Sequence, residues 1–464
     1  MAVERAPETA RAHADAALVK AIGLRSAALL VITNVIGSAI FLTPGTMAAT
    51  LPSESLLLVA WVAGGVIAVC GGLTYAEMGA MFPRSGGLYV FLEEAYGSLV
   101  AFLFGWSCML VVLTGSMATV AVGFAKYFSY FVPALSTENV VAAVPLPWGI
   151  WSISAGQIAA AVSILALGAV NYVGIRSGNL LQATLTVIKV AALAALPIVA
   201  LALHPVTPVL TPLVPAGGHT AMAFGVVMIA VMWAYEGWYY VPFCAGEIEN
   251  PKRNVPLALL IGIGALITIY LSVNVAYMLA LPLEEIRGVE RIAEKAVVAL
   301  VGAPGARLVA ATVVVSTLGC NAAAVIATSR ACFAMAVDGL FFKSAARVHP
   351  RYRTPHVAIV MTCGWSALLT LTGTYEQLFT RVTFASVVFG VLGGLAIFRL
   401  RKSRPDAERP YRAWGYPIVP ALFVGGLIVL VANTLLARPA ESLSGLVLVA
   451  LGLPAFWYWR GAGR

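Results

Sequence analysis

Long apolar runs follow one another along almost the whole chain, and they constrain its fold more than any other feature. The chain has 464 residues, of which 61% are hydrophobic and only 11% are charged. Runs of about 18 or more apolar residues with few charges are typical of helices that cross a lipid bilayer. Twelve such runs lie near residues 25–50, 56–80, 97–129, 153–173, 178–203, 220–244, 256–281, 307–335, 355–373, 376–400, 416–437 and 444–460. The sequence therefore predicts an all-α membrane protein with twelve transmembrane helices.

Basic residues gather on alternate connections between these runs. If residues 1–24 form an N-terminal tail inside the cell, 21 of the 29 lysines and arginines fall on cytoplasmic segments and seven fall outside. This bias follows the positive-inside rule and predicts a multi-pass protein of the cell inner (plasma) membrane with both termini in the cytoplasm. The tail lacks a short apolar region followed by a cleavage site, so we expect no removable signal peptide. The net charge of +9 thus reflects topology, and we expect no nucleic-acid partner.

Cysteine and histidine positions argue against disulfides, metals and an enzyme. The six cysteines lie in or at the ends of apolar runs, where they are expected to pack as small apolar residues. No CxxC or His–Cys spacing suggests a metal site. The histidines lie in loops or at span ends, at His13, His204, His219, His349 and His356. We therefore expect no metal, no cofactor and no catalytic residues.

The twelve spans divide into two sets of five and a remaining pair. Because five is odd, the second set would enter the membrane from the side opposite to the first, which makes a 5+5 inverted repeat. Each set opens with an interrupted run, so helices 1 and 6 are expected to be broken, and spans 11 and 12 to be peripheral. The predicted units are a tail at 1–24, a first repeat at 25–203, a second repeat at 204–400, and a cytoplasmic loop with two spans at 401–464.

The first interruption contains Gly37 and Ser38, with Pro44 shortly after. Backbone can unwind at membrane depth only where protein or a watery cavity surrounds it. Unwinding here would free amides at the start of a half-helix, where the helix dipole favours an anion such as a carboxylate. A face of small residues that packs against another helix is the alternative.

The second interruption contains Glu236 between Tyr235 and Gly237. A charge at that depth costs about 3 kcal/mol on insertion scales. The carboxylate, or carbonyls freed nearby, can meet a substrate ammonium or a proton. The alternative is a neutral, hydrogen-bonded glutamic acid that joins helices.

Two further polar residues lie inside apolar runs. Lys189 is about twelve residues from either end of its span, too deep to reach the interface easily. A cation there must pair, lose its proton or replace a metal ion, unless it is purely structural. Asn321 is a second candidate, with helix–helix hydrogen bonding as its alternative role.

Several ordered motifs support a resemblance over about residues 20–460. They are Ile36-Gly37-Ser38-Ala39-Ile40-Phe41, Phe82-Pro83-Arg84-Ser85-Gly86-Gly87 with Glu94-Ala95-Tyr96-Gly97, Asn171-Tyr172-Val173-Gly174-Ile175-Arg176-Ser177-Gly178, the run Trp233 to Trp238 with Glu247-Ile248-Glu249-Asn250-Pro251, Asp338-Gly339-Leu340-Phe341-Phe342, and Arg409-Pro410-Tyr411-Arg412. Together they resemble the amino acid–polyamine–organocation (APC) superfamily, and most closely a bacterial-type member of its L-type amino acid transporter branch.

The resemblance implies the inverted-repeat transporter fold and a set of binding residues. It implies that the substrate carboxylate meets amides of the first break and that its ammonium meets carbonyls at Val35, Trp233 and Glu236. Trp233 matches an aromatic gate, and Lys189 matches a lysine that stands in a sodium position, which implies sodium independence. The expected substrate-binding residues are Val35, Gly37, Ser38, Ala39, Trp233, Ala234, Tyr235, Glu236 and Asn321.

Three departures from the family pattern affect these expectations. Ala39 stands where glycine is usual, which would stiffen or narrow the carboxylate site. Glu236 stands where glycine, serine or aspartate is commoner, which leaves the preferred charge of the substrate open. The connection 130–152 lacks the cysteine through which animal members bind a glycoprotein heavy chain, so we expect no disulfide-linked heavy chain.

The sequence thus favours a sodium-independent secondary transporter of neutral L-amino acids that exchanges them by alternating access. A proton-coupled importer that uses Glu236 or Lys189, and a carrier that accepts cationic amino acids at Glu236, stay open. From a different class, an amino-acid receptor or binding protein in the membrane stays open as well.

Overall fold

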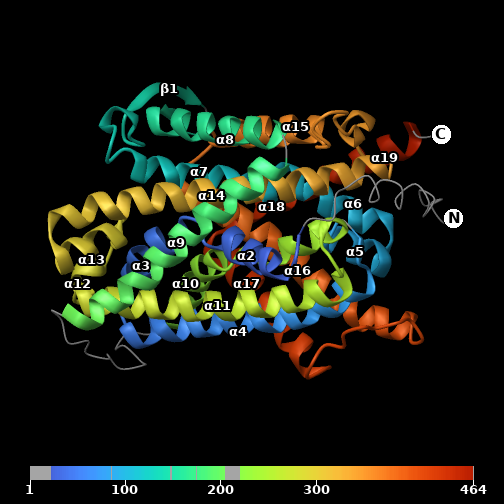
Figure 1. Ribbon diagram of the computed structural model, residues 1–464, viewed down its shortest axis with the longest axis horizontal. Coiled ribbons are helices and arrows are strands. Elements are labelled where there is room, and N and C mark those ends of the chain that lie inside the picture. The colour runs from blue at the N-terminus through green and yellow to red at the C-terminus, as the bar shows by residue number, and fades with distance from the viewer. Residues whose placement is uncertain (1–21, 85, 147–148, 174, 204–219, 463–464) are drawn as a thin grey trace.

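Most of the described chain is helical. The computed structural model describes residues 22–84, 86–146, 149–173, 175–203 and 220–462 (Figure 1). Residues 1–21 of the expected tail and the start of the expected second repeat, 204–219, lie outside the described residues. The division into a tail, two repeats and a last pair of spans therefore stays a prediction.

Eighteen α-helices are interrupted or joined by four short helical turns of other types. The α-helices are α2 (Leu24–Val35), α3 (Ala39–Thr50), α4 (Glu54–Met81), α5 (Leu88–Tyr96), α6 (Ser98–Ser107), α7 (Leu113–Phe128), α8 (Ala155–Val173), α9 (Ile175–Leu203), α10 (Thr220–Ala234), α11 (Pro251–Ala280), α12 (Leu283–Ile286), α13 (Ile292–Val301), α14 (Ala303–Val337), α15 (His356–Leu369), α16 (Tyr375–Ser403), α17 (Ile418–Ala437), α18 (Pro439–Ala450) and α19 (Gly452–Ala462). The π-helix η1 (Cys108–Val112) joins α6 to α7, and the 3₁₀ helices are η2 (Pro133–Leu135), η3 (Trp238–Glu247) and η4 (Lys343–Ala346). These counts refer to the described residues alone.

Apolar helices long enough to cross a bilayer make up most of this structure. By length and composition, the described ranges contain nine such spans, or ten when the bent pair α2 and α3 counts as one. Two shorter apolar helices, Val187–Leu203 and His356–Leu369, lie where the sequence predicts spans 5 and 9. The multi-pass membrane character is confirmed, and the number twelve stays a prediction.

A two-stranded hairpin departs from the all-α expectation. Strands β1 (Val140–Leu146) and β2 (Gly149–Ser154) pair antiparallel, with Val144 opposite Trp151. Both strands are rich in β-branched residues, which favour an extended backbone. The indole of Trp151 donates a hydrogen bond of 2.8 Å to the Leu371 carbonyl, so tertiary contact holds the hairpin against the α15–α16 connection.

Helices of the first half pack against their counterparts in the second half. Helix α4 lies along α11, α7 along α14, and α8 along α15. The broken spans also meet, because α2 contacts η3 and α3 contacts α10. This pairing is what an inverted repeat would produce, and the repeat itself stays a prediction.

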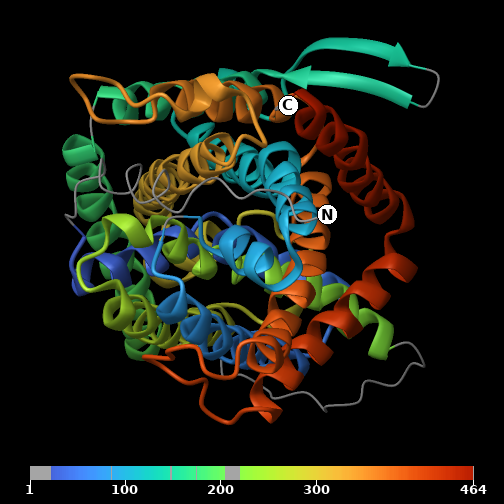
Figure 2. The ribbon, with the colours of Figure 1, turned by 90° about the vertical axis from the view of Figure 1, so that its right-hand side faces the viewer.

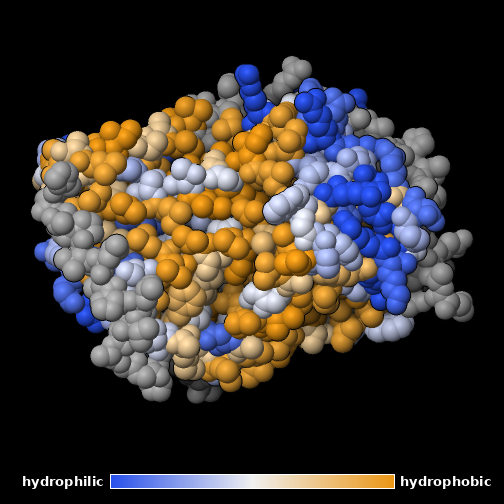
Figure 3. Space-filling model, turned by 90° about the horizontal axis from the view of Figure 1, so that it is seen from below, coloured by the Kyte–Doolittle hydropathy of each residue, from blue (hydrophilic) through white to orange (hydrophobic). Residues whose placement is uncertain are grey.

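The two ends of the bundle differ in what they carry. Figure 1 shows the hairpin, α12 and α13 toward one end and α5 with α19 toward the other; Figure 2 looks onto the latter. We call these the hairpin end and the α5 end. In Figure 3 apolar surface covers most of one side of the bundle, and hydrophilic residues gather at the α5 end.

Buried ion pairs hold the α5 end together. The Arg330 guanidinium lies 2.9 Å from the Glu247 carboxylate, and the two side chains are 2% and 1% exposed. Glu77 is fully buried and lies 2.6 Å from Arg401, which comes from the end of α16. The backbone amide of Ala413 donates to the same carboxylate. Such a pair is strongly destabilising when one partner is removed, since the other is left charged and desolvated.

We expect Glu247→Gln to lower the free energy of unfolding by about 3–5 kcal/mol, because it leaves Arg330 buried without a counter-charge. Glu408→Gln is the matched control, since its pair with Lys252 is 76% and 51% exposed and is expected to contribute at most about 1 kcal/mol. Thermal unfolding of the purified protein in detergent would compare them, and equal midpoints would contradict the prediction.

Candidate functional site

The first broken helix bends at the predicted position. Helix α2 ends at Val35, α3 begins at Ala39, and the two axes differ by 40°. The Gly37 amide donates a hydrogen bond of 2.8 Å to the Val35 carbonyl, which closes a tight turn. The amides of Ser38 and Ala39 then stand at the start of α3, where a helix supplies no carbonyl partner for them.

The second broken helix also ends where the sequence predicts. Helix α10 stops at Ala234, and η3 starts at Trp238 after the turn that contains Glu236. Gly237 has a φ of +108°, which favours glycine, and a Cβ there would lie 3.0 Å from the Asn34 carbonyl oxygen. The glycine therefore permits the turn and lets the two breaks touch.

A small central cavity lies where the two breaks meet. Its volume is about 20 Å³, room for roughly one water molecule. Its lining residues are Asn34, Val35, Gly37, Ser38, Ala39, Ser116, Val120, Trp233, Glu236, Tyr240, Cys320, Asn321 and Ala324. Seven of the nine residues expected to bind substrate are in this set.

Ala234 and Tyr235 lie outside that lining. The Tyr235 ring is 1% exposed and packs against Trp61 and Tyr270, with centroid separations of 6.1 and 5.1 Å. Its hydroxyl donates to the Trp61 carbonyl. The structure therefore places Tyr235 as an anchor of α10 against α4 and α11, one residue away from the cavity.

Side chains from other helices satisfy the carbonyls freed at the breaks. The Tyr270 hydroxyl lies 3.2 Å from the Val35 carbonyl and 2.8 Å from the Ala234 carbonyl, which links the ends of α2 and α10. The Cys320 thiol donates to the Asn34 carbonyl at 3.2 Å.

Lys189 belongs to the same supporting set. It is fully buried, and its Nζ donates to the carbonyls of Thr33 and Ile36 at 2.9 and 2.7 Å. A cation at the carboxyl end of a helix interacts favourably with the helix dipole. Lys189 does not line the central cavity, so it acts on the broken helix rather than on a molecule inside the cavity.

Glu236 faces the cavity with both carboxylate oxygens engaged. The Tyr239 hydroxyl donates to one oxygen, and the Ser386 hydroxyl donates to the other at 2.9 Å. These bonds join the break to α16 and supply donors to the buried carboxyl group.

Asn34 and Asn321 bring unpaired acceptors to the cavity. The Asn321 Nδ2 donates to the Met117 carbonyl at 3.2 Å. The Oδ1 atoms of both residues are buried and have no hydrogen-bond partner within the described part of the chain. Asn34, Ser116 and Cys320 were missed from sequence, although Asn34 directly precedes the predicted Val35.

A single layer of side chains closes the cavity toward the hairpin end. The Tyr375 hydroxyl lies 3.0 Å from the Ser38 hydroxyl and accepts from the Trp233 indole at 3.1 Å. Phe379 stacks on Trp233 with centroids 6.1 Å apart. The gating role that the resemblance implies for Trp233 stays a prediction.

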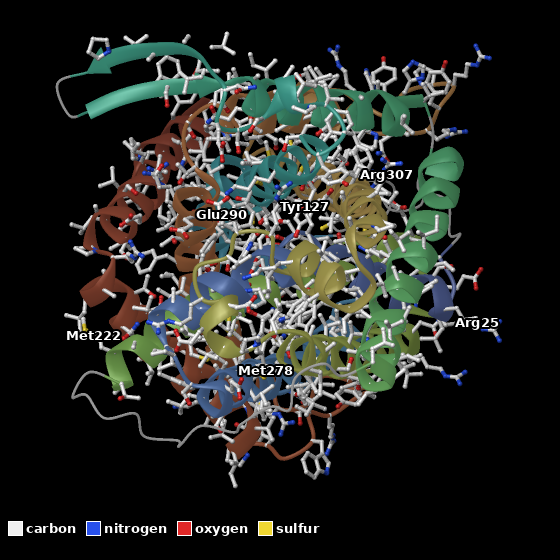
Figure 4. The ribbon with its side chains drawn as sticks, turned by 90° about the vertical axis from the view of Figure 1, so that its left-hand side faces the viewer. Arg25, Tyr127, Met222, Met278, Glu290 and Arg307 are labelled. Atoms are coloured by element: carbon white, nitrogen blue, oxygen red, sulfur yellow. The ribbon has the colours of Figure 1, made fainter. Side chains whose placement is uncertain are left out.

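Beyond that layer lies a larger outer cavity of about 630 Å³, lined by residues that include Tyr375 and Phe379. Its wall includes the hairpin residue Trp151 and the ion pair of Lys126 with Glu290, 2.6 Å long. Figure 4 views the hairpin end and labels Glu290 over the middle of the bundle.

Metal and disulfide chemistry have no candidates in the described ranges. No group of three His, Cys, Asp or Glu side chains there could hold a metal ion. The six cysteines, all described, are buried free thiols.

A bundle of membrane helices with two broken spans around a closed cavity is the architecture of a secondary transporter. The chain matches the family model "Amino acid permease" over residues 22–453. It belongs to that family and to the APC superfamily, as its motifs predicted. Transporters of this family are not enzymes.

Proteins with similar sequences include amino acid exchangers and transporters. The chain is 30% identical over 449 residues to the Serine/threonine exchanger SteT of Bacillus subtilis, which covers 96% of this chain and 97% of that protein. It is 28% identical to the Asc-type amino acid transporter 1 of Mus musculus, over 96% of this chain and 82% of the relative. The Large neutral amino acids transporter small subunit 2 of Homo sapiens is 29% identical, over 98% of this chain and 84% of that relative.

We expect Tyr375→Phe to open the layer between the two cavities more often, because two hydrogen bonds of about 1 kcal/mol each are lost. In a variant whose one cysteine is Cys320, a small methanethiosulfonate reagent should then modify Cys320 about tenfold faster. Tyr96→Phe is the control, since its hydroxyl bonds the Leu392 carbonyl away from both cavities. Equal rates in both variants would contradict a gate at Tyr375.

Proposed function

We propose that this protein is a sodium-independent exchanger of neutral L-amino acids that works by alternating access. The observation that carries the proposal is the meeting of two broken helices at a closed cavity, with Lys189 bound to the first of them. Amides at the start of α3 on one side and backbone carbonyls of the two breaks on the other suit the two charged groups that every amino acid shares.

The substrate carboxylate would take the amides of Ser38 and Ala39, and that of Gly37 once its 2.8 Å bond to the Val35 carbonyl opens. The positive end of α3 points at that position and favours an anion. The ammonium would take carbonyls at Val35, Trp233 and Glu236. Tyr270 and the Gly37 amide already donate to the Val35 carbonyl, so the ammonium would have to replace one of these two donors there.

Lys189 supports sodium independence. Its ammonium lies 2.9 and 2.7 Å from two carbonyl oxygens at the first break, so a fixed positive charge already serves those acceptors. A second cation at the same carbonyls would meet like-charge repulsion.

We propose that the protein lies in the plasma membrane with its α5 end and both termini on the cytoplasmic side, because most lysines and arginines belong to that side. The hairpin end then faces outside, and the outer cavity is the substrate's entrance. The hairpin contains no cysteine, which supports function without a disulfide-linked heavy chain.

Alternating access would use the two unequal closures. Rotation of Tyr375 away from Ser38 and Trp233 opens the central cavity to the outer one. Opening toward the cytoplasm requires separation of the layers at the α5 end, where Arg330 meets Glu247 and Arg401 meets Glu77. A bound amino acid would shift this equilibrium by its difference in affinity for the two states.

Two alternatives of the same class involve Glu236. A proton-coupled importer would protonate this carboxyl group, and a carrier of cationic amino acids would bind the substrate's side chain there. Glu236 lines the central cavity, so either role is within its reach. An amino-acid receptor is the alternative from another class.

We expect labelled neutral amino acids to enter liposomes that hold the purified protein only when unlabelled amino acids are inside. Uptake should be equal in sodium and choline buffers, because the Lys189 ammonium takes the place of a sodium ion. Gly37→Val should abolish uptake, since a Cβ there already lies 3.3 Å from Cys320 and Val120 atoms. Gly264→Val is the matched control, because nothing lies within 4 Å of its added Cβ.

Other outcomes of this assay identify the alternatives. Uptake into empty liposomes that follows a proton gradient would indicate proton coupling instead of exchange. A requirement for sodium would contradict the role given to Lys189. Saturable binding without uptake would favour a receptor.

We expect Glu236→Gln to keep neutral exchange within about threefold of wild type, with the same pH dependence. Glutamine keeps one oxygen acceptor and adds a donor that the Tyr239 or Ser386 oxygen can accept. Exchange would be measured between pH 5.5 and 8, with lysine as a second substrate. Loss of a pH dependence, or of lysine transport, would assign Glu236 to the corresponding alternative.

A further inference from the structure

Two buried carboxamide oxygens at the central cavity have no hydrogen-bond partner among the described residues. They are the Oδ1 atoms of Asn34 and Asn321, whose side chains are 8% and 1% exposed. The bond from Asn321 Nδ2 to the Met117 carbonyl sets the orientation of that amide, because a carbonyl can only accept. Buried acceptors are normally paired, so two at one cavity point to donors supplied by a ligand.

The other polar side chains of the cavity are already engaged. Glu236 accepts from Tyr239 and Ser386, one hydroxyl at each oxygen. The Ser116 hydroxyl donates to the Val112 carbonyl at 2.7 Å. The Cys320 thiol donates to the Asn34 carbonyl. The two carboxamide oxygens are therefore the unpaired side-chain acceptors of this cavity within the described structure.

We propose that Asn34 and Asn321 select amino acids whose side chain carries an uncharged hydrogen-bond donor, a hydroxyl or a carboxamide. This inference rests on the proposed function and specifies its substrate class. The carboxamides are neutral, so they attract a donor without providing a counter-charge for an ammonium.

In this closed state the cavity has room for a water molecule and not for an amino acid, so it must widen when a substrate enters. About 20 Å³ holds roughly one water, which could bridge the two oxygens when no substrate is bound. A substrate hydroxyl would replace that water and its hydrogen bonds. An aliphatic side chain would displace the water and leave the oxygens buried and unpaired, which disfavours it.

Threonine and valine provide the test, because they have nearly the same shape and differ in one hydroxyl. Each would compete with labelled alanine for exchange into alanine-loaded liposomes. We expect threonine to compete at least about tenfold better than valine in the wild-type protein. Asn34→Ala and Asn321→Ala should each lower that ratio, and the double variant should bring it close to one.

Asn433→Ala is the matched control. Its carboxamide packs against Gly225 between α17 and α10, its Nδ2 is unpaired in the described structure, and it does not line the central cavity. The ratio of threonine to valine should stay at the wild-type value in this variant.

Equal competition by threonine and valine in the wild-type protein would overturn the inference, whatever the variants do. Stronger competition by lysine than by threonine would overturn it too, because an uncharged donor would not be the preferred one. Absence of exchange for every neutral amino acid would instead contradict the proposed function.

Discussion

The structure depends on how the carbonyls freed at its two broken helices are satisfied. No water reaches the hydrocarbon region, so a freed backbone group needs a protein partner or a cavity. Lys189 from α9 binds the carbonyls of Thr33 and Ile36, and Tyr270 from α11 bridges Val35 and Ala234. These partners approach from outside the cavity, so the backbone can stay unwound while the inner face remains free for a ligand.

The unequal closure of the two ends follows from the same geometry. Toward the hairpin end, one layer formed by Trp233, Tyr375 and Phe379 separates a cavity of about 20 Å³ from one of about 630 Å³. Toward the α5 end, the fully buried pair of Arg330 with Glu247 and the partly buried pair of Arg401 with Glu77 hold the helix ends together. Aromatic rings joined by two hydrogen bonds separate more readily than buried charges do. The hairpin end is therefore the easier one to open from this state.

Much of the fold could be predicted because hydrophobic length and local backbone chemistry are written along the chain. The break after Val35 and the break after Ala234 were both placed correctly, and the family resemblance was confirmed. The hairpin at Val140–Ser154 was missed. Its short β-branched strands become ordered through pairing and through the bond from Trp151 to Leu371, and neither is visible in local sequence.

By itself, the sequence determined that the chain spans a membrane, where its helices break, and which polar residues enter the apolar runs. Tertiary structure decided which of those residues reach the cavity. Asn34 lines it and Tyr235 does not, although each adjoins a predicted break. The physical reason is that a break interrupts the regular helical spacing, so the sequence no longer fixes the direction in which each side chain points. That direction depends on partners such as Tyr270, which lie far away in the chain.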